Sequence, residues 1–255
     1  MSAKFDAFAA LHVPGAPVIL FNVWDAGSTR AAEKAGAKAI ATGSASVAGA
    51  NGYDDAESLP LDLAFANAGR IVGATSLPVS VDFEGGYAVD PGETAANVGR
   101  LAATGAIGCN FEDQIVATSK TPGRTMHAVA DQSARIAAIR AAVGPSFFLN
   151  ARTDLFLIAR ADTHDDAMVD AAIARGRAYA EAGASGFFVP GLADLRLLER
   201  VCKAVPLPVN FMAFPGAPSA KDVAATGIAR ISHGPFPHML AMKAFEDAAR
   251  AAFAD

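Results

Sequence analysis

Short apolar, β-branched runs alternate eight times along the chain with longer, alanine-rich segments of helical period. We expect strands at residues 18–24, 39–43, 79–83, 108–111, 147–151, 186–189, 209–212 and 230–232. We expect helices at residues 28–35, 57–72, 92–104, 131–143, 165–182, 194–204, 219–225 and 237–252. Apolar runs this short predict buried strands, and the segments between them are long enough for crossover helices. The pattern therefore predicts an α/β fold of the (β/α)₈-barrel type.

A glycine separates several predicted helices from the strands that follow them. It recurs in Lys34-Ala35-Gly36-Ala37, Ala103-Thr104-Gly105-Ala106, Glu181-Ala182-Gly183-Ala184 and Ala225-Thr226-Gly227-Ile228. Glycine readily adopts the left-handed conformation in which many helices end. Because these connections are short and no low-complexity linker divides the chain, we expect one domain over residues 1–255.

Composition disfavours several classes of function. With 52% apolar and 18% charged residues, the chain is suited to a large packed core rather than to disorder. A net charge of −5 argues against a nucleic-acid surface. The sequence contains no run of about 18 uncharged apolar residues, so we expect no membrane span. The two cysteines, Cys109 and Cys202, lie far apart without metal-binding spacing. We therefore expect a cytoplasmic protein without disulfides.

Acidic residues follow three of the predicted strands. They occur in Val81-Asp82-Phe83-Glu84, Asn110-Phe111-Glu112-Asp113 and Asn150-Ala151-Arg152-Thr153-Asp154. The carboxyl ends of barrel strands share one rim, where carboxylates repel each other unless a cation lies among them. Carboxylates with few histidines suit Mg²⁺, or Mn²⁺, better than zinc. The ordinary alternative is a set of strand-end residues that cap loops or pair with lysines.

Each of several other candidate residues has both a functional and a purely structural interpretation. Arg152 could hold a substrate carboxylate through two hydrogen bonds or form a rim ion pair. The small residues Gly43, Ser44 and Ala45 could offer backbone N–H groups to an anion, as could any Gly/Ser turn. Trp24 could line a pocket or pack in the core. Asp55 could reach a metal through water or stand at a helix start.

A long connection, residues 115–129, separates the fourth predicted strand from the next helix. Loops of this length in a compact barrel are often active-site lids. Within it, Lys120 and His127 are candidates for proton transfer, although exposed loop charges usually have no such role. No lysine stands at a strand end, which disfavours a Schiff-base aldolase.

Taken together, these segments resemble the isocitrate lyase/phosphoenolpyruvate mutase superfamily over nearly the whole chain. The matching motifs are Asn22-Val23-Trp24-Asp25, Gly43-Ser44-Ala45, Gly52-x-x-Asp55, Asp82-x-Glu84-Gly85-Gly86-Tyr87, Gly108-x-Asn110-x-Glu112-Asp113-Gln114, Ala151-Arg152-Thr153-Asp154 and Pro208-Val209-Asn210. The resemblance implies a barrel of the phosphoenolpyruvate/pyruvate-binding type and a Mg²⁺-dependent enzyme that acts on a 2-oxo or 2-hydroxy carboxylic acid. It also implies a homo-oligomer, a dimer or a tetramer.

The resemblance also implies roles for individual residues. Asp82 would hold the metal directly, while Asp55, Glu84 and Glu112 would reach it through waters. Arg152 and the backbone at Ser44 and Ala45 would bind the carboxylate of a 2-oxo acid, with Trp24, Gly43 and Asn210 as further contacts. Glu112 and Arg152 would take part in catalysis, as would Lys120 or His127.

The chain departs from the family pattern in four ways. The loop after the fourth predicted strand lacks the cysteine of the lyase branch. Lys120-Thr121 stands near the position where the phosphonate branch has an Asn-Ser pair. Glu84 replaces the commoner aspartate of the metal motif. Members often carry a longer C-terminal part with a helix exchanged between subunits, and the end at Asp255 predicts a shortened or missing exchange.

The function that we expect is a carbon–carbon lyase, or a mutase-like relative, that works through a metal-stabilised enolate. A decarboxylase of oxaloacetate-like acids or a phosphonopyruvate hydrolase is the close alternative. A barrel that binds a keto acid without catalysis is an alternative of another class, because the usual proton donors of the loop are missing.

Overall fold

A computed structural model describes residues 3–116 and 125–254 of the chain. Eight parallel strands form one sheet in the order β1-β10-β9-β8-β7-β4-β3-β2, and a bridge between Val23 and Thr42 joins its two ends. The strands are β1 (Val18–Leu20), β2 (Ile40–Ala41), β3 (Val79–Asp82), β4 (Gly108–Glu112), β7 (Phe148–Arg152), β8 (Gly186–Phe188), β9 (Val209–Met212) and β10 (Arg230–Ser232). The predicted (β/α)₈ barrel is confirmed.

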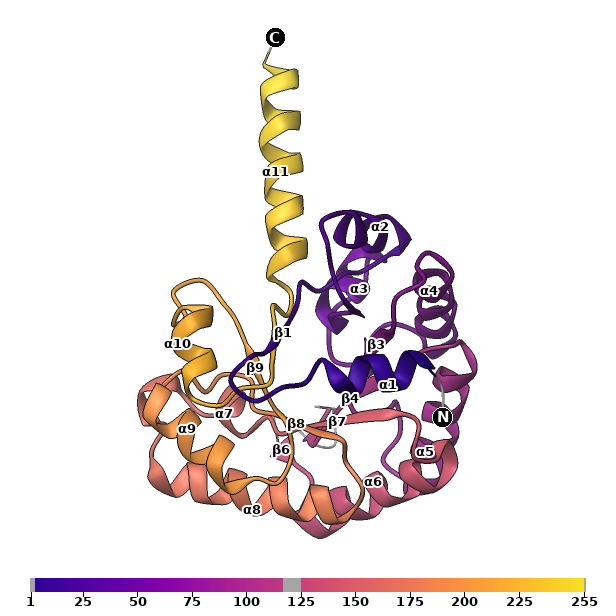
Figure 1. Ribbon diagram of the computed structural model, residues 1–255. Coiled ribbons are helices and arrows are strands. Elements are labelled where there is room, and N and C mark those ends of the chain that lie inside the picture. Colours follow the sequence, from indigo (N-terminus) through magenta and orange to yellow (C-terminus); the bar gives the residue numbers. More distant parts are fainter. Residues whose placement is uncertain (1–2, 117–124, 255) are drawn as a thin grey trace.

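Helices cover the outside of the barrel (Figure 1). The helices of the described residues are α1 (Ala3–Ala10), α2 (Ala26–Lys34), α3 (Ser44–Ala50), α4 (Leu61–Gly73), α5 (Pro91–Ala103), α6 (Val129–Val143), α7 (Leu155–Ile158), α8 (Asp166–Glu181), α9 (Leu195–Ala204), α10 (Ala220–Ala225) and α11 (Phe236–Phe253), with a 3₁₀ turn at Ala161–Thr163. Of these, α1, α3, α7 and α11 lie at the ends of the barrel or project from it, and the others surround it. Most strands are buried on both faces, as parallel sheets covered by helices are, whereas Ile19 on β1 is exposed. Cys109 on β4 packs into the core between sheet and helices, as its place in the strand alternation predicts, and its thiol is free.

The predicted glycine ends of the helices are also confirmed. All four glycines have positive φ angles: Gly36 at 98°, Gly105 at 94°, Gly183 at 101° and Gly227 at 97°. A side chain with a Cβ is strained in this region, so glycine allows each chain segment to turn directly from helix to strand.

The helix expected at residues 57–72 starts later, at Leu61. Ala56 and Glu57 have φ angles of 67° and 56°, which no α-helix contains, and Pro60 takes the N-cap position. Apolar residues with helical spacing occur before Pro60 as well, but the backbone there does not form a helix because Ala56 and Glu57 have positive φ angles. Segment 51–60 is consequently a loop that reaches over the barrel mouth, and Asp55 lies in it.

Several elements were absent from the sequence-based prediction. Helix α1 covers the N-terminal end of the barrel, where the Phe8 ring packs edge-on against Phe148 and His12 stacks on the same ring. A two-stranded hairpin, β5 (Gln114–Ile115) and β6 (Thr125–Met126), follows β4. Helix α11, by contrast, confirms the helix expected at residues 237–252; it extends away from the barrel (Figure 1) and exposes Leu240 and Phe245. Among the described residues, no helix combines the length and apolarity needed for a membrane span.

Candidate active site

A cavity of about 440 Å³ opens at the carboxyl ends of the strands. Asp82, Glu84, Glu112 and Arg152 line it, each at or just past the end of β3, β4 or β7. The connection after β2 contributes further predicted residues to its wall, namely Gly43, Ser44 and Ala45, and the loop before α4 contributes Asp55. The barrel therefore brings most of the predicted site residues into one cavity.

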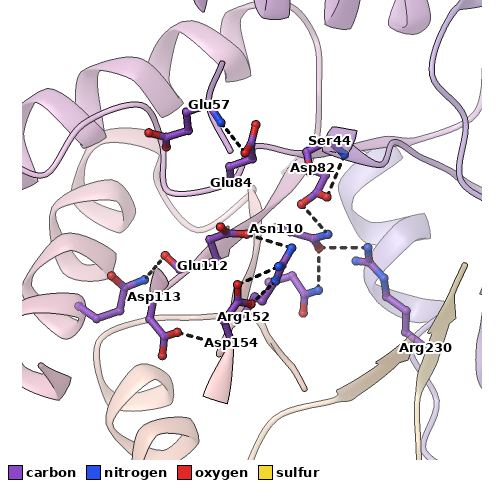
Figure 2. A network of polar contacts seen from close by, with 12 residues as sticks. Ser44, Glu57, Asp82, Glu84, Asn110, Glu112, Asp113, Arg152, Asp154 and Arg230 are labelled. Carbon is purple, nitrogen blue, oxygen red and sulfur yellow. Dashed lines mark hydrogen bonds and ion pairs between the residues drawn. The ribbon is translucent and has the colours of Figure 1, made fainter. Parts of the chain in front are cut away.

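Asp82 is held in place by three hydrogen bonds, and Figure 2 shows the two that its carboxylate accepts. Its Oδ2 accepts a hydrogen bond from the backbone N–H of Ser44 at 3.1 Å, and its Oδ1 accepts one from Asn110 Nδ2 at 3.2 Å. Its own backbone N–H donates to Thr42 Oγ1 at 2.8 Å. One carboxylate is thus oriented toward the cavity by neighbours from β2, α3 and β4.

Glu84 is buried among other carboxylates. Its Oε2 accepts a hydrogen bond from the backbone N–H of Glu57 at 2.7 Å (Figure 2). Burial, followed by repulsion from Asp55 and Asp82, raises the pKa of Glu84 to about 8, although the Glu57 N–H opposes this rise. The backbone of Glu84 has a φ of 50°, a conformation that non-glycine residues rarely adopt outside functional sites.

Glu112 and Asp154 hold Arg152 between them. Arg152 Nη1 lies 2.9 Å from Glu112 Oε2, while Nε and Nη2 donate to the two oxygens of Asp154 at 2.5 and 2.9 Å. Burial raises the pKa of Glu112 well above its usual value, with Arg152 opposing the rise. Burial alone would lower the pKa of Arg152, but Asp154 and Glu112 raise it, so the guanidinium stays charged. Two of its five N–H donors remain for a substrate.

Asp113 supports this arrangement and was not predicted as a site residue. Its Oδ1 accepts the backbone N–H of Asp154 at 3.0 Å, and its Oδ2 accepts from Arg175 Nη1 at 3.0 Å and the Tyr179 hydroxyl at 2.8 Å. The signal in the sequence is the pair Arg175 and Tyr179, four residues apart on one face of α8.

Arg230 is a second residue that the sequence analysis did not single out. It lies on β10 inside the barrel, buried below the cavity, and its Nη2 donates to Asn110 Oδ1 at 3.1 Å (Figure 2). Asn150 Nδ2 donates to the same oxygen at 2.8 Å. Asn110 is thereby turned so that its amide group faces Asp82. Alternation along β10, where Arg230 and Ser232 share one face, could have indicated an inward arginine.

The donor set fits a hard divalent cation. Among the described residues, no three Asp, Glu, His or Cys side chains converge closely enough to form an all-protein metal site. Mg²⁺ commonly uses one or two carboxylates and retains several waters, so it does not require such a cluster. The lining contains Asp55, Asp82, Glu84, Glu112 and Asp154, which are more carboxyl groups than its described cation, Arg152, can neutralise.

Three of the predicted residues lie elsewhere, and a fourth is not described. Trp24 packs beside Val47 and Leu59 and edge-on to His238, and Asn210 is buried deeper in the barrel, so neither lines the cavity. His127 is also buried away from the cavity lining, and burial together with Arg135 lowers its pKa to about 4. Lys120 lies outside the described residues.

Comparisons with known proteins agree with this geometry. The family model described as phosphoenolpyruvate phosphomutase matches residues 8–253. The 2-methylisocitrate lyase of Escherichia coli (strain K12) is 30% identical over 80% of this chain and 67% of its own length. A solved structure of a phosphonomutase-like protein from Burkholderia cenocepacia J2315 is 46% identical, covers 98% of each chain and has a TM-score of 0.92.

A solved phosphonopyruvate hydrolase in complex with oxalate and Mg²⁺ shares the fold, with a TM-score of 0.84 and 20% identity over 99% of this chain and 88% of that one. Together with these relatives, the barrel identifies an enzyme of the lyase and mutase type. The chain belongs to the phosphoenolpyruvate mutase family of the isocitrate lyase/phosphoenolpyruvate mutase superfamily.

Proposed function

We propose that this protein is a Mg²⁺-dependent carbon–carbon lyase, or a mutase-like relative, that acts on a 2-oxo or 2-hydroxy carboxylic acid through an enolate. The observation that carries the proposal is the convergence of Asp82, Glu84 and Glu112 with Arg152 in one cavity. Asp82 would hold the metal, and Asp55, Glu84 and Glu112 would support it through waters. When bound, Mg²⁺ would act as a Lewis acid for the negative charge that develops on the substrate.

The protein's own residues would bind and orient the acid. Arg152 would hold the substrate carboxylate through its two remaining N–H donors, since Glu112 and Asp154 already fix the plane of the guanidinium. The Ser44 N–H donates to Asp82, so the backbone N–H of Ala45 is the next donor available for the substrate at the start of α3. Gly43 has no side chain to block the approach.

Proton transfer would fall to Glu112 and to the loop after β5. Burial raises the pKa of Glu112 well above its usual value, which favours a proton on this carboxyl group, and the group would lie beside the acid that Arg152 binds. Lys120 remains the loop candidate. His127 would act from a buried position and as a neutral imidazole, because its pKa lies at about 4.

We also infer that the protein forms a homo-oligomer in the cytoplasm. The feature that supports self-association is α11, which exposes Met239, Leu240, Met242 and Phe245 to solvent. Apolar side chains in such number on one projecting helix usually mark a protein contact.

The test is a substrate panel with Mg²⁺, comprising oxaloacetate, phosphonopyruvate and several 2-alkylmalates, in which release of pyruvate, or of the 2-oxo acid that each 2-alkylmalate would yield, is followed. Turnover that is lost in Asp82→Ala, with unchanged circular dichroism, would support the proposal. Release of CO₂ or of phosphate would identify a decarboxylase or a phosphonate hydrolase instead. Tight oxalate binding without turnover on any acid would indicate a non-catalytic keto-acid-binding barrel.

A further inference from the structure

Arg135, on α6, is among the largest fully buried side chains of the described residues. It does not line the cavity, and it forms no ion pair with any described carboxylate. Its guanidinium donates instead to the side-chain oxygen of Gln132 and to the backbone carbonyls of Gly85 and Ala88. A buried charge is costly unless it is hydrogen-bonded, so these acceptors and Arg135 depend on each other.

The segment that accepts two of these hydrogen bonds is the turn after β3. Arg135 Nη2 donates to the Ala88 carbonyl at 2.7 Å and also to the Gly85 carbonyl. Three residues of this segment have positive φ angles, namely Glu84 at 50°, Gly86 at 81° and Tyr87 at 58°. Non-glycine residues keep this conformation only where their surroundings fix the backbone. The two hydrogen bonds from Arg135 supply such a restraint.

The same arginine also reaches the end of β4. Its guanidinium carbon lies 4.7 Å from the centre of the Phe111 ring, and a Cβ added at Gly86 would lie 3.2 Å from Phe111 Cε2. Gln132, which accepts from Arg135 at 2.6 Å, donates to the backbone oxygen of Glu112 at 3.0 Å. Helix α6 therefore connects the turn after β3 with the end of β4, the two segments that carry the buried glutamates of the cavity.

Glu57 holds the same turn from another element. It accepts the backbone N–H of Tyr87 and donates its own backbone N–H to the Glu84 carboxylate. Burial lowers the pKa of Arg135, and Glu57 is the group that opposes this lowering most. The turn is thus fixed through its carbonyls by a buried cation and through an N–H by a carboxylate.

We propose that Arg135 is a positioning residue of the metal site, which holds the turn after β3 so that the Glu84 carboxylate faces a cation bound at Asp82. Arg135 does not line the cavity, so it acts through Glu84 rather than on the cation itself. The inference rests on the proposed function, because it assumes that Mg²⁺ binds at Asp82 with Glu84 in contact through water. Loss of a group that orients a metal site from outside commonly lowers metal affinity about ten- to a hundred-fold.

Calorimetric titration of the metal-free protein with Mg²⁺ tests the proposal in a double-mutant cycle of Arg135→Met and Glu84→Gln. We expect Arg135→Met alone to weaken Mg²⁺ binding about ten-fold. In the Glu84→Gln background the same change should alter the affinity by less than about two-fold, because the carboxylate that Arg135 positions is already gone. A loss of equal size in both backgrounds would show a general effect on folding and would overturn the inference.

Arg135→Lys keeps a charged donor for the two carbonyls but loses the hydrogen bond to Gln132, so we expect a smaller loss, about three-fold. This variant carries the same cycle if Arg135→Met does not fold. Arg140→Met is the matched control, because Arg140 lies on the same helix and donates to backbone carbonyls before β7 and β8, at the opposite end of the barrel. It should lower Tm but leave the Mg²⁺ affinity unaltered.

The wild-type titration separates the two proposals. If the wild-type protein does not bind Mg²⁺, the proposed function fails and the role of Arg135 fails with it. If the wild-type protein binds Mg²⁺ and the Arg135 variants bind it equally well, only the role of Arg135 is overturned.

Discussion

Glu84 is buried beside other carboxylates, and its ionisation should depend on the metal. Its pKa in the folded, metal-free protein is raised to about 8 from an ordinary 4.5. The folded state therefore retains a proton that the unfolded state releases, so this contribution to stability is complete below pH 4.5 and is lost as the pH rises to about 8.

We accordingly expect the free energy of unfolding of the metal-free protein to fall between pH 6 and pH 8, by up to about 1.4 kcal/mol per pH unit from this group. Bound Mg²⁺ should largely remove the dependence, because the cation replaces the proton. Urea denaturation at several pH values, with EDTA and with Mg²⁺, measures this. Glu84→Gln is the control, and a slope in EDTA equal to that of the wild type would show that other groups cause it.

Arg152 should not tolerate replacement by lysine. The guanidinium contacts Glu112 and Asp154 at once and still keeps donors for a substrate, whereas an ammonium group cannot present the same planar set. We expect Arg152→Lys to lower kcat/KM roughly a hundred-fold, which corresponds to about 3 kcal/mol of lost transition-state stabilisation. Most of this effect should appear as a higher KM.

Arg160→Lys provides a matched control for this change. Arg160 pairs with Asp162 in the same Arg-x-Asp spacing, but both side chains are exposed. Steady-state kinetics on the substrate identified by the panel should separate the two variants. Equal kinetics of Arg152→Lys and Arg160→Lys would show that Arg152 does not bind the substrate.

At the scale of elements, the loop before α4 is anchored to the turn after β3. The Glu57 backbone N–H donates to Glu84 Oε2, and Glu57 Oε1 accepts the backbone N–H of Tyr87 at 2.8 Å. Ala56, Glu57, Glu84 and Tyr87 all have positive φ angles, so the strained backbone of both segments is concentrated at this junction. The junction places Asp55 and Glu84 on the same cavity.

Glu57→Ala should release the loop and weaken Mg²⁺ binding by about three- to ten-fold, while the barrel stays folded. The loss of one charged hydrogen bond accounts for a change of this size. Hydrogen exchange should rise in residues 52–60 and calorimetry should report the affinity. Glu181→Ala, at the exposed end of α8, should change neither quantity, and unchanged exchange in Glu57→Ala would show that the junction does not hold the loop.

At the scale of the whole molecule, α11 projects from the barrel, so the barrel does not bury its apolar side chains. Leu240 and Phe245 are 66% and 72% exposed. If α11 is the contact between subunits, Leu240→Asp combined with Phe245→Asp should convert the oligomer to a smaller species, since burying two carboxylates in an apolar interface is unfavourable. Light scattering coupled to size-exclusion chromatography measures the mass.

Val89→Asp is the control for that change, because Val89 is equally exposed but lies outside α11. It should leave the mass unaltered. A wild-type protein that is monomeric at micromolar concentration, or a double variant of unchanged mass, would contradict an interface on α11.

Local patterns in the sequence determined the barrel itself. Each strand is a short apolar run, each crossover carries a helical period, and the glycines at positions 36, 105, 183 and 227 end helices by conformational preference alone. Because strand ends share one rim in any such barrel, the cluster of Asp82, Glu84, Glu112 and Arg152 followed from the order of the elements.

Only the tertiary structure decided what lies around those residues. The contacts of Asp113 with Arg175 and Tyr179, and of Arg230 with Asn110, join residues 62 to 120 positions apart, and no local pattern encodes such pairs. The late start of α4 likewise depends on contacts between elements, since the Glu57 backbone N–H donates to Glu84 Oε2. Local preference specifies where an element forms, whereas packing between distant elements specifies which side chains face one another.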